Sequence, residues 1–287
     1  ISIETSKPAE DALSYLLIDM GANGVQIEDN ISNPQKITLI VYFPSDDIIG
    51  ERINRIKQIL DEMRSLGIDI GKGSISLRNF DDLSWQDSWK RFFKPLPIGE
   101  RIVVYPSWED ISEFNSRDVS IQIDPSMAFG TGKHSTTILS LEMLEKTIKG
   151  GERVLDIGTG SGILAIASAK LGADYVLAVD IDPIAANIAK ENSKINGVDN
   201  KIRVICGDLT SAINDKYDVV VSNIFTKILL LMMSSIKSYL IDGGCWILSG
   251  ILETERSEVE SALIREKFHI LDISSYQEWV CILAQMP

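Results

Sequence analysis

Three closely spaced glycines follow an apolar segment in the middle of the chain. Val154–Ile157 runs directly into Gly158-x-Gly160-x-Gly162, and a helical pattern begins immediately afterwards. Glycines at such a turn let the backbone bend sharply and let a ligand approach without meeting a Cβ atom. The first turn of the following helix also presents unpaired N–H groups. The pattern predicts a cofactor-binding loop, although nicotinamide and flavin enzymes use similar loops.

Two neighbouring residues distinguish between these cofactors. The dinucleotide pattern G-x-G-x-x-G requires a small residue five positions after its first glycine, where this chain has Ile163. Asp156 stands two positions before the first glycine, where a carboxylate would repel a pyrophosphate. The same carboxylate would attract a ligand that carries an ammonium and a sulfonium group. The residues therefore predict S-adenosylmethionine, with its methionine amine near the loop.

Polar residues also end the strands that are expected next along the chain. Asp180 lies 22 residues after Gly158, and its carboxylate can accept hydrogen bonds from both ribose hydroxyls. Asp208 is a candidate for the adenine amino group, or it is a simple turn residue. Asn223 follows an apolar strand, and its amide can hold an incoming amine or the methionine part of the cofactor, unless it only forms an Asx turn.

The elements that must position these residues alternate between strand and helix from about residue 101. The expected order is strand 153–157, helix 163–171, strand 175–179, helix 183–196, strand 202–206, strand 217–222, helix 227–239, strand 245–249, helix 253–267 and strand 279–284, with a further helix over 134–149. Such alternation predicts a doubly wound, mostly parallel sheet, the Rossmann-like fold of class I methyltransferases. Ligands bind such sheets at the carboxyl ends of the strands.

The first 80 residues show a different order of signals. Residues 1–5, 24–28, 36–43 and 74–80 have strand patterns, while residues 9–20 and 46–66 have helical spacing. The order β-α-β-β-α-β is that of a small α+β ferredoxin-like domain. We therefore expect a substrate-recognition domain at 1–80, a linker at 81–100 with a short aromatic helix at 84–93, and a methyltransferase domain at 101–287.

Composition limits the partners and the compartment. The net charge of −13 disfavours direct binding of RNA or DNA and favours a basic protein partner. No apolar run is long enough to span a membrane, and the acidic first 20 residues do not look like a signal peptide. Three separated cysteines in apolar stretches predict buried thiols in a cytoplasmic protein. Two histidines and the lack of a Cys-x-x-Cys motif predict no metal site.

One segment makes the substrate more specific. Residues 124–137, which read Asp-Pro-Ser-Met-Ala-Phe-Gly-Thr-Gly-Lys-His-Ser-Thr-Thr, resemble the D-P-x-x-A-F-G-T-G-x-H-x-T-T segment of the PrmA family, whose members methylate ribosomal protein L11 of the large subunit. Similar agreement extends over the stretches 85–90, 154–169, 179–183, 222–224 and 278–280. The resemblance covers essentially the whole chain and is weakest over the first 80 residues.

The resemblance implies an N-terminal domain that recognises the ribosomal protein and a flexible linker between the two domains. It assigns cofactor contacts to Thr137, Gly158, Asp180 and Asn223, and a closing loop to Phe129–Thr131. Thr131 is the alternative to Thr137 for the threonine contact. Asp156 and Gly160 join this set from the loop itself. The residues predict amine methylation by orientation and desolvation, with Asn223 holding the amine or the cofactor and without a dedicated base. We expect a monomer, in which His134 lies at the start of a helix, orders the preceding loop and is not catalytic.

The chain departs from the family pattern after Asn223-Ile224. Family members usually continue with Leu-Ala, whereas this chain has Phe225-Thr226 next to the predicted acceptor site. The preferred amine and the number of methyl groups transferred are therefore open.

Other functions are also compatible with a glycine loop. The main alternative is a related class I methyltransferase that acts on RNA or on another protein. Enzymes that methylate planar nitrogens typically carry an Asn/Asp-Pro-Pro-aromatic segment where this chain has Asn223-Ile224-Phe225-Thr226. A nicotinamide dehydrogenase is opposed by Asp156 and Ile163. A cofactor-binding scaffold without activity is a third reading.

Overall fold

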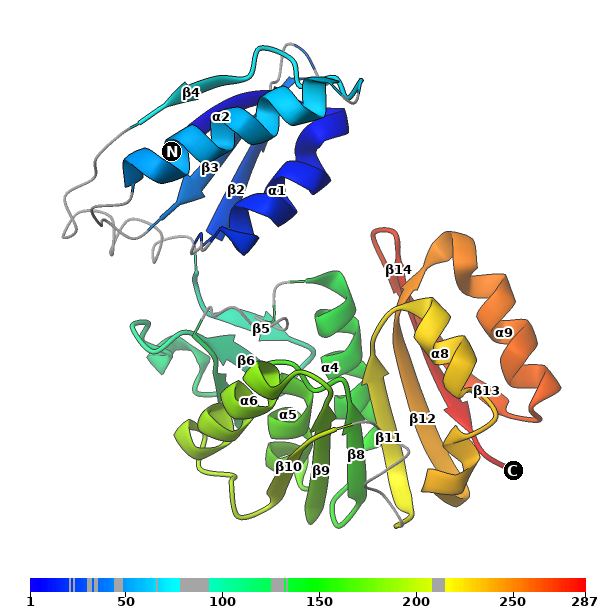
Figure 1. Cartoon of the computed structure of the whole chain (residues 1–287). Helices are drawn as coiled ribbons and strands as arrows, with labels where there is room; N and C mark the ends of the chain where they lie inside the picture. Colours follow the sequence, from blue (N-terminus) through cyan, green and yellow to red (C-terminus); the bar gives the residue numbers. More distant parts are fainter. Residues whose placement is uncertain are drawn as a thin grey trace. The chain divides into compact units, whose positions relative to one another are not determined.

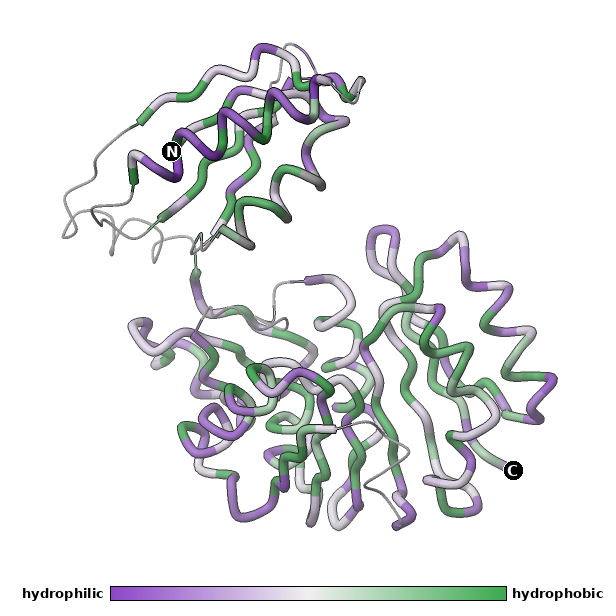
Figure 2. Tube along the Cα trace, viewed as in Figure 1, coloured by the Kyte–Doolittle hydropathy of each residue, from purple (hydrophilic) through white to green (hydrophobic). Residues whose placement is uncertain are grey.

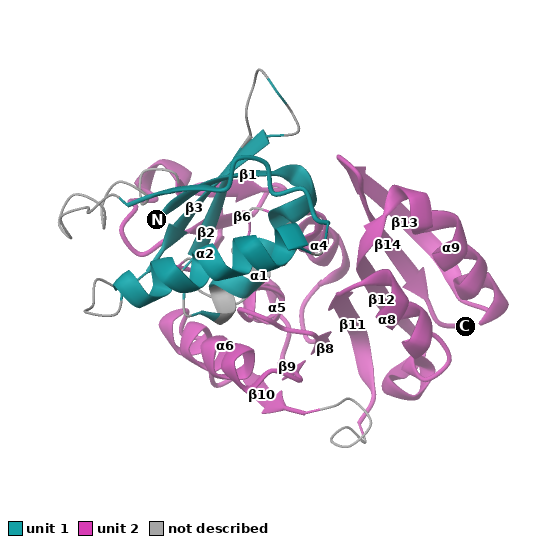
Figure 3. Ribbon diagram, turned by 45° about the horizontal axis from the view of Figure 1, so that its top comes forward, with its two compact units in different colours: residues 1–87 teal, residues 88–287 magenta. Residues whose placement is uncertain are grey.

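The chain folds into two compact units, Ile1–Asp87 and Ser88–Pro287 (Figure 3). The computed structural model describes residues 1–20, 22, 24–29, 33, 36–43, 49–65, 67–77, 93–124, 132, 134–207 and 215–287. The expected helix at 84–93 and most of the expected linker therefore lie outside the described residues.

The first unit contains the predicted α+β arrangement. Its elements in chain order are β1 (Ser2–Ser6), a 3-10 turn (Lys7–Ala9), α1 (Glu10–Asp19), β2 (Gly24–Asp29), β3 (Lys36–Tyr42), α2 (Ile49–Ser65) and β4 (Ser74–Ser76). The strands form an antiparallel sheet in the order β2-β3-β1-β4. Both helices lie against one face of this sheet, where Ile3, Leu13, Leu39, Ile56 and Leu60 form a buried core (Figure 1). The predicted ferredoxin-like domain is confirmed.

The second unit is built on a seven-stranded sheet. Its strands are β8 (Arg153–Ile157), β9 (Tyr175–Asp180), β10 (Ile202–Cys206), β11 (Tyr217–Asn223), β12 (Leu240–Leu252), β13 (His269–Tyr276) and β14 (Trp279–Gln285). They lie in the order β10-β9-β8-β11-β12-β14-β13. Among these seven strands only β14 runs in the direction opposite to the others. The predicted doubly wound, mostly parallel sheet is confirmed.

Helices cover both faces of this sheet. Successive residues of a strand point to opposite faces, and apolar residues occur on both. Val154 belongs to a core with α4 (Ser135–Thr147) and α5 (Ile163–Leu171), whereas Leu155 belongs to a core with α8 (Thr226–Met232) and α9 (Arg256–Arg265). The helix α6 (Pro183–Ile195) packs beside α5. The sheet strands are largely hydrophobic, while α9 carries many hydrophilic residues (Figure 2). Among the described residues, no helix combines the length and the apolar character of a membrane span.

A smaller sheet packs against α5. It consists of β5 (Leu96–Ile98), β6 (Ile102–Tyr105) and β7 (Val119–Gln122), and a 3-10 turn at Ser112–Phe114 lies between β6 and β7. Ile102, Val104, Val119 and Ile121 extend the same core as Val154. The strand β5 of this sheet also contacts α4.

Three expectations need correction. The predicted helix 227–239 ends at Met232 and resumes as a 3-10 turn at Ile236–Tyr239, because the Ser235 side chain and N–H both bond to the Met232 carbonyl. The edge strand β13 was not predicted, and its alternation is weak because Leu271 is exposed. Cys206 is exposed rather than buried, since it ends β10 at the surface.

The start of α5 depends on the backbone freedom of Gly162. This residue has φ +83°, and a Cβ atom there would lie 3.1 Å from both Cα and Cβ of Ala189 in α6. We expect Gly162→Ala to lower the free energy of unfolding by about 3 kcal/mol, from left-handed strain together with overpacking. Urea denaturation of the whole chain measures this loss.

Gly197→Ala is the matched control. Gly197 has φ +67°, but nothing lies within 4 Å of a Cβ atom built on it. In Gly197→Ala the free energy of unfolding should fall only by the cost of the left-handed backbone conformation, about 1 kcal/mol. Equal losses in the two variants would contradict the close packing of α5 against α6.

Candidate active site

A large cavity lies along the carboxyl edge of the seven-stranded sheet, and we call it the edge cavity. Its volume is about 670 Å³. The residues that line it in the spatial order of the strands are Gly207 after β10, Asp180 of β9, Gly158 after β8, Asn223 of β11, Gly250 of β12 and Trp279 of β14. Thr136 and Thr137 from the first turn of α4 close it from one side. The topology thus brings residues from six strands to one ligand-sized space.

Asp180 fastens the glycine loop to the end of the neighbouring strand. Its Oδ2 accepts a hydrogen bond of 2.8 Å from the backbone N–H of Gly160, and its Oδ1 accepts one of 3.0 Å from the N–H of Asp182. Each carboxylate oxygen can accept a further bond. Because the side chain is only partly buried and lines the edge cavity, it can bind two adjacent hydroxyl groups of a ligand.

Gly158 allows the loop to approach the segment after β11. It has φ +74°, and a Cβ atom on it would lie 2.5 Å from Cγ2 of Ile224. A side chain at this position would therefore push Ile224 away or fill the cavity between them. This close approach explains why the first glycine of the pattern is needed.

The structure places Asp156 beneath the loop, outside the lining of the edge cavity. Its carboxyl group is completely buried, and Oδ2 accepts hydrogen bonds from Thr159 Oγ1 at 2.6 Å and from the Ala165 N–H at 3.1 Å. Its Oδ1 has no hydrogen-bond partner in the described part of the chain. Burial raises the pKa of Asp156 to about 7. Its position therefore suits it to hold the loop on α5 rather than to contact a ligand.

The first turn of α4 and the end of β11 meet at Asn223. Asn223 Nδ2 lies 3.5 Å from Thr137 Oγ1, a long and weak hydrogen bond. His134 is the N-cap of α4, and its Nδ1 lies 2.8 Å from Thr136 Oγ1. The His134 ring also packs edge-on against Trp279, with centroids 5.1 Å apart. These contacts place His134 at the start of α4, as the sequence predicted, while most of the loop that it was expected to order lies outside the described residues.

The two residues that depart from the family pattern point in different directions. Phe225 is 77% exposed and lies at the mouth of the edge cavity. Thr226 is buried, and its Oγ1 donates a hydrogen bond of 2.5 Å to Glu255 Oε2. The Thr226 hydroxyl therefore links the turn after Asn223 to the segment that follows β12. The Phe225 ring is exposed to ligands that enter the edge cavity.

The predicted site residues are brought together only in part. Thr137, Gly158, Gly160, Asp180 and Asn223 line the edge cavity. Phe129, Thr131 and Asp208 lie outside the described residues.

Ile224, Gly250 and Trp279 are among the lining residues that sequence reasoning did not assign to the site. Trp279 carried two signals, because it opens an apolar strand and lies in the stretch 278–280 that resembles the family. In the described part of the chain, no cluster of three His, Cys, Asp or Glu side chains could hold a metal ion.

Known proteins resemble this chain over its full length. The family model described as ribosomal protein L11 methyltransferase (PrmA) matches residues 1–287. A ribosomal protein L11 methyltransferase of Caldicellulosiruptor bescii is 40% identical over 99% of this chain and 97% of the relative. That of Anoxybacillus flavithermus is 36% identical over 99% of this chain and 98% of the relative. The crystal structure of a ribosomal protein L11 methylase from Lactobacillus delbrueckii subsp. bulgaricus has a TM-score of 0.64 and 33% identity, and the match covers 68% of this chain and 100% of that chain.

The buried Asp156 should make stability depend on pH. Its pKa of about 7 in the folded state exceeds the value near 4 of an unfolded chain, so the folded state holds the proton more tightly. Stability is then lost as pH rises towards the folded pKa. Relative to Asp156→Asn, the free energy of unfolding of the unaltered protein should fall by about 2 kcal/mol between pH 5 and pH 7 and change little above pH 8.

Urea titrations of both proteins at several pH values measure this difference. The asparagine Oδ1 can accept the same two hydrogen bonds, so the variant should fold. Parallel stability curves for the two proteins would show that Asp156 does not hold a proton when the protein is folded.

Proposed function

The chain belongs to the PrmA family of ribosomal protein L11 methyltransferases, and from this premise we infer that it transfers methyl groups from S-adenosylmethionine to amino groups of ribosomal protein L11. It is an S-adenosylmethionine-dependent protein N-methyltransferase. The observation in the structure that carries this function is the edge cavity, in which Asp180, the glycine loop and Asn223 lie in sequence along the sheet.

The residues around the edge cavity fit S-adenosylmethionine. The cavity volume of about 670 Å³ is in the range of small-molecule sites. The Asp180 carboxylate suits the two ribose hydroxyls, and Gly158 and Gly160 leave room for the ligand beside the loop. Thr137 and Asn223 then hold the methionine end. Asp156 contributes to cofactor binding indirectly, through the loop that it supports. The family resemblance adds Phe129 and Thr131 to the residues that contact the cofactor.

The cofactor supplies a methyl group activated on a sulfonium. When bound, it would give this methyl group to the lone pair of a neutral amine and leave as a thioether, and the proton that the methylated nitrogen then carries would pass to solvent. A lysine must first be neutral, which costs about 5 kcal/mol at pH 7 from its ordinary pKa. Much of the edge cavity wall is apolar, including Ile157, Ile224 and Ile228, and this desolvation favours the neutral amine.

No described side chain in the edge cavity is well placed as a dedicated base. The titratable residues of its described lining are His134, Asp180 and Asp182. His134 caps α4, and Asp180 and Asp182 accept hydrogen bonds from backbone N–H groups. Catalysis then depends on orientation of the amine by Asn223 and on exclusion of water.

The remaining parts of the proposal concern the whole chain. The first unit recognises the ribosomal protein, while the second unit carries the reaction. The enzyme acts in the cytoplasm as a monomer and makes no direct contact with nucleic acid. The net charge of −13 supports attraction of a basic ribosomal protein.

Asp180→Asn should weaken cofactor binding. An asparagine in place of Asp180 would turn an amide donor towards the N–H of Gly160 or Asp182 and would lose the negative charge. Loss of one or two such bonds should raise the Kd of S-adenosylmethionine roughly 10- to 100-fold. Isothermal titration calorimetry measures the Kd. The matched control is Asp174→Asn, which alters an exposed residue directly before the first residue of β9. An unchanged Kd in Asp180→Asn would remove this residue from the binding site.

Asn223→Ala should separate binding from transfer. Misplacement of the reacting amine lowers the turnover rate on the order of 100-fold, while the cofactor Kd should rise less than tenfold. Radiolabelled methyl transfer to purified ribosomal protein L11 gives the rate, and mass spectrometry gives the number of methyl groups. Transfer at the unaltered rate would contradict the role of Asn223 in holding the amine.

A further inference from the structure

A second cavity adjoins the edge cavity, and we call it the hairpin cavity. Its volume is about 510 Å³. Three segments of the second unit line it: Lys94–Leu96 at the start of β5, the first turn of α4 with His134, Ser135 and Ile138, and the turn between β13 and β14 with Tyr276–Trp279. His134 and Trp279 line both cavities. The rings of these two residues, which pack edge to face, therefore form the wall that the cavities share.

The strand order decides which end of the edge cavity this wall closes. Asp180 of β9 and Gly207 after β10 lie at one end, on one side of β8. Asn223 of β11 lies on the other side of β8, and β14 with Trp279 lies beyond it. If ribose hydroxyls occupy Asp180, the part of the edge cavity on the side of β14 stays available for an amine that reaches Asn223. The hairpin cavity lies on that side.

The wall made by the hairpin is held in a defined shape. Tyr276 pairs with Trp279 across a two-residue turn, in which Gln277 has φ +55°. Ser135 Oγ donates a hydrogen bond of 2.7 Å to Gln277 Oε1, and the Glu253 N–H donates one of 2.8 Å to the Glu278 carbonyl. The turn is thus fixed both to α4 and to the end of β12, so its side chains present a preformed surface.

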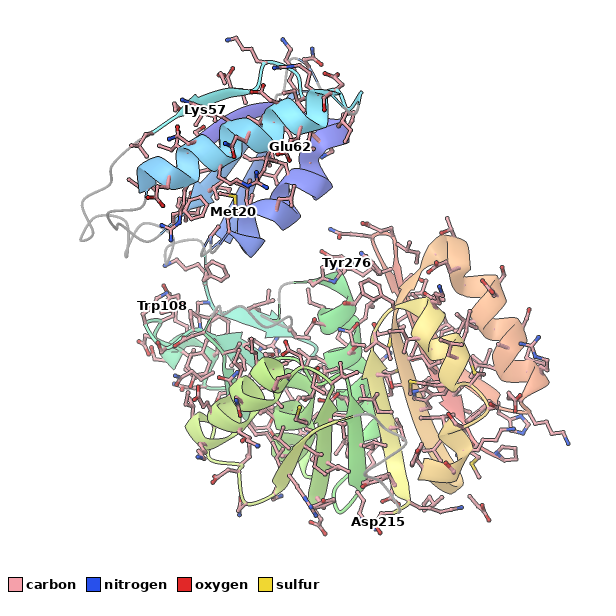
Figure 4. The ribbon with its side chains drawn as sticks, viewed as in Figure 1. Met20, Lys57, Glu62, Trp108, Asp215 and Tyr276 are labelled. Atoms are coloured by element: carbon pink, nitrogen blue, oxygen red, sulfur yellow. The ribbon has the colours of Figure 1, made fainter. Side chains whose placement is uncertain are left out.

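The chemistry of this surface suits a basic chain. Tyr276 is half exposed at the hairpin, where its ring can cover the aliphatic part of a long side chain (Figure 4). Glu278 is exposed in the same turn. The charge of Lys94 is partly offset, because its Nζ lies 2.9 Å from Glu109 Oε1. The turn therefore combines an aromatic face with a carboxylate, which favours a lysine and its neighbouring basic residues.

We propose that the hairpin cavity is the acceptor groove, in which an extended basic segment of the substrate protein lies along Leu96, Tyr276 and Gln277. The reactive lysine passes from this groove across the His134–Trp279 pair to Asn223. The inference rests on the proposed function and assigns to the β13–β14 turn a binding role for the polypeptide around the acceptor amine.

Steady-state kinetics with the full chain and purified ribosomal protein L11 test the groove. Tyr276→Ala should raise the KM for the protein substrate about tenfold, with kcat and the Kd of S-adenosylmethionine changed less than twofold. Glu278→Lys should also raise that KM, and its effect should shrink at high salt. The matched control is Leu271→Ala, which removes a side chain of similar exposure from β13 outside the groove and should leave the KM unchanged.

Site-specific photo-crosslinking provides a readout that does not depend on these variants folding equally well. A benzophenone amino acid in place of Tyr276 should capture the substrate protein, whereas the same group in place of Leu271 should not. The proposed acceptor groove is contradicted if the unaltered enzyme methylates the substrate, both Tyr276→Ala and Glu278→Lys have the KM of the control, and the crosslinker at position 276 captures no substrate protein. If the unaltered enzyme transfers no methyl group to this substrate, the proposed function itself fails.

Discussion

The hydrogen bond from the Gly160 N–H to the Asp180 carboxylate is the interaction on which the site depends. At 2.8 Å it joins the loop after β8 to the end of β9, and so fixes the loop at the carboxyl edge of the sheet. The same carboxylate also accepts the N–H of Asp182, which is the N-cap of α6. One side chain therefore sets the position of the loop, the strand end and the next helix. Without this hydrogen bond, the glycine loop would not be fixed relative to the other residues that line the edge cavity.

Two carboxyl groups support this loop from opposite sides, and their surroundings give them different properties. Asp180 faces the edge cavity with access to solvent, where a carboxylate can accept hydrogen bonds from a ligand. Asp156 is buried under the loop among apolar residues, and burial raises its pKa to about 7. Its Oδ1, which has no partner among the described residues, suits a protonated carboxyl group that supports the loop without a full charge. The sequence places both acids near the loop, but only packing separates their roles.

Much of the second unit could be predicted because local patterns and sheet topology agree. The helix from Pro183 with Asp182 as its N-cap, and the strand that ends at Asp180, follow from capping residues and apolar runs. The grouping of Asp180 and Asn223 follows from the rule that ligands bind at the carboxyl ends of parallel strands. The burial of Asp156 could not be predicted, because the sequence does not show which face of a short strand α5 covers. Trp279 was missed because an antiparallel strand brings its first residue, not its last, to that edge.

The antiparallel strand β14 gives the site its asymmetry. Since β14 is inserted between β12 and β13, its first residue lies beside the last residues of the parallel strands. The hairpin turn that precedes it therefore lies at the same edge as the glycine loop after β8. Parallel strands can contribute only their final residues to this edge, and these already line the edge cavity. A hairpin contributes a turn with side chains on both strands, and here it adds Tyr276, Gln277 and Trp279 beside the edge cavity. In the proposed function, the parallel strands would bind the cofactor and the antiparallel pair would receive the substrate.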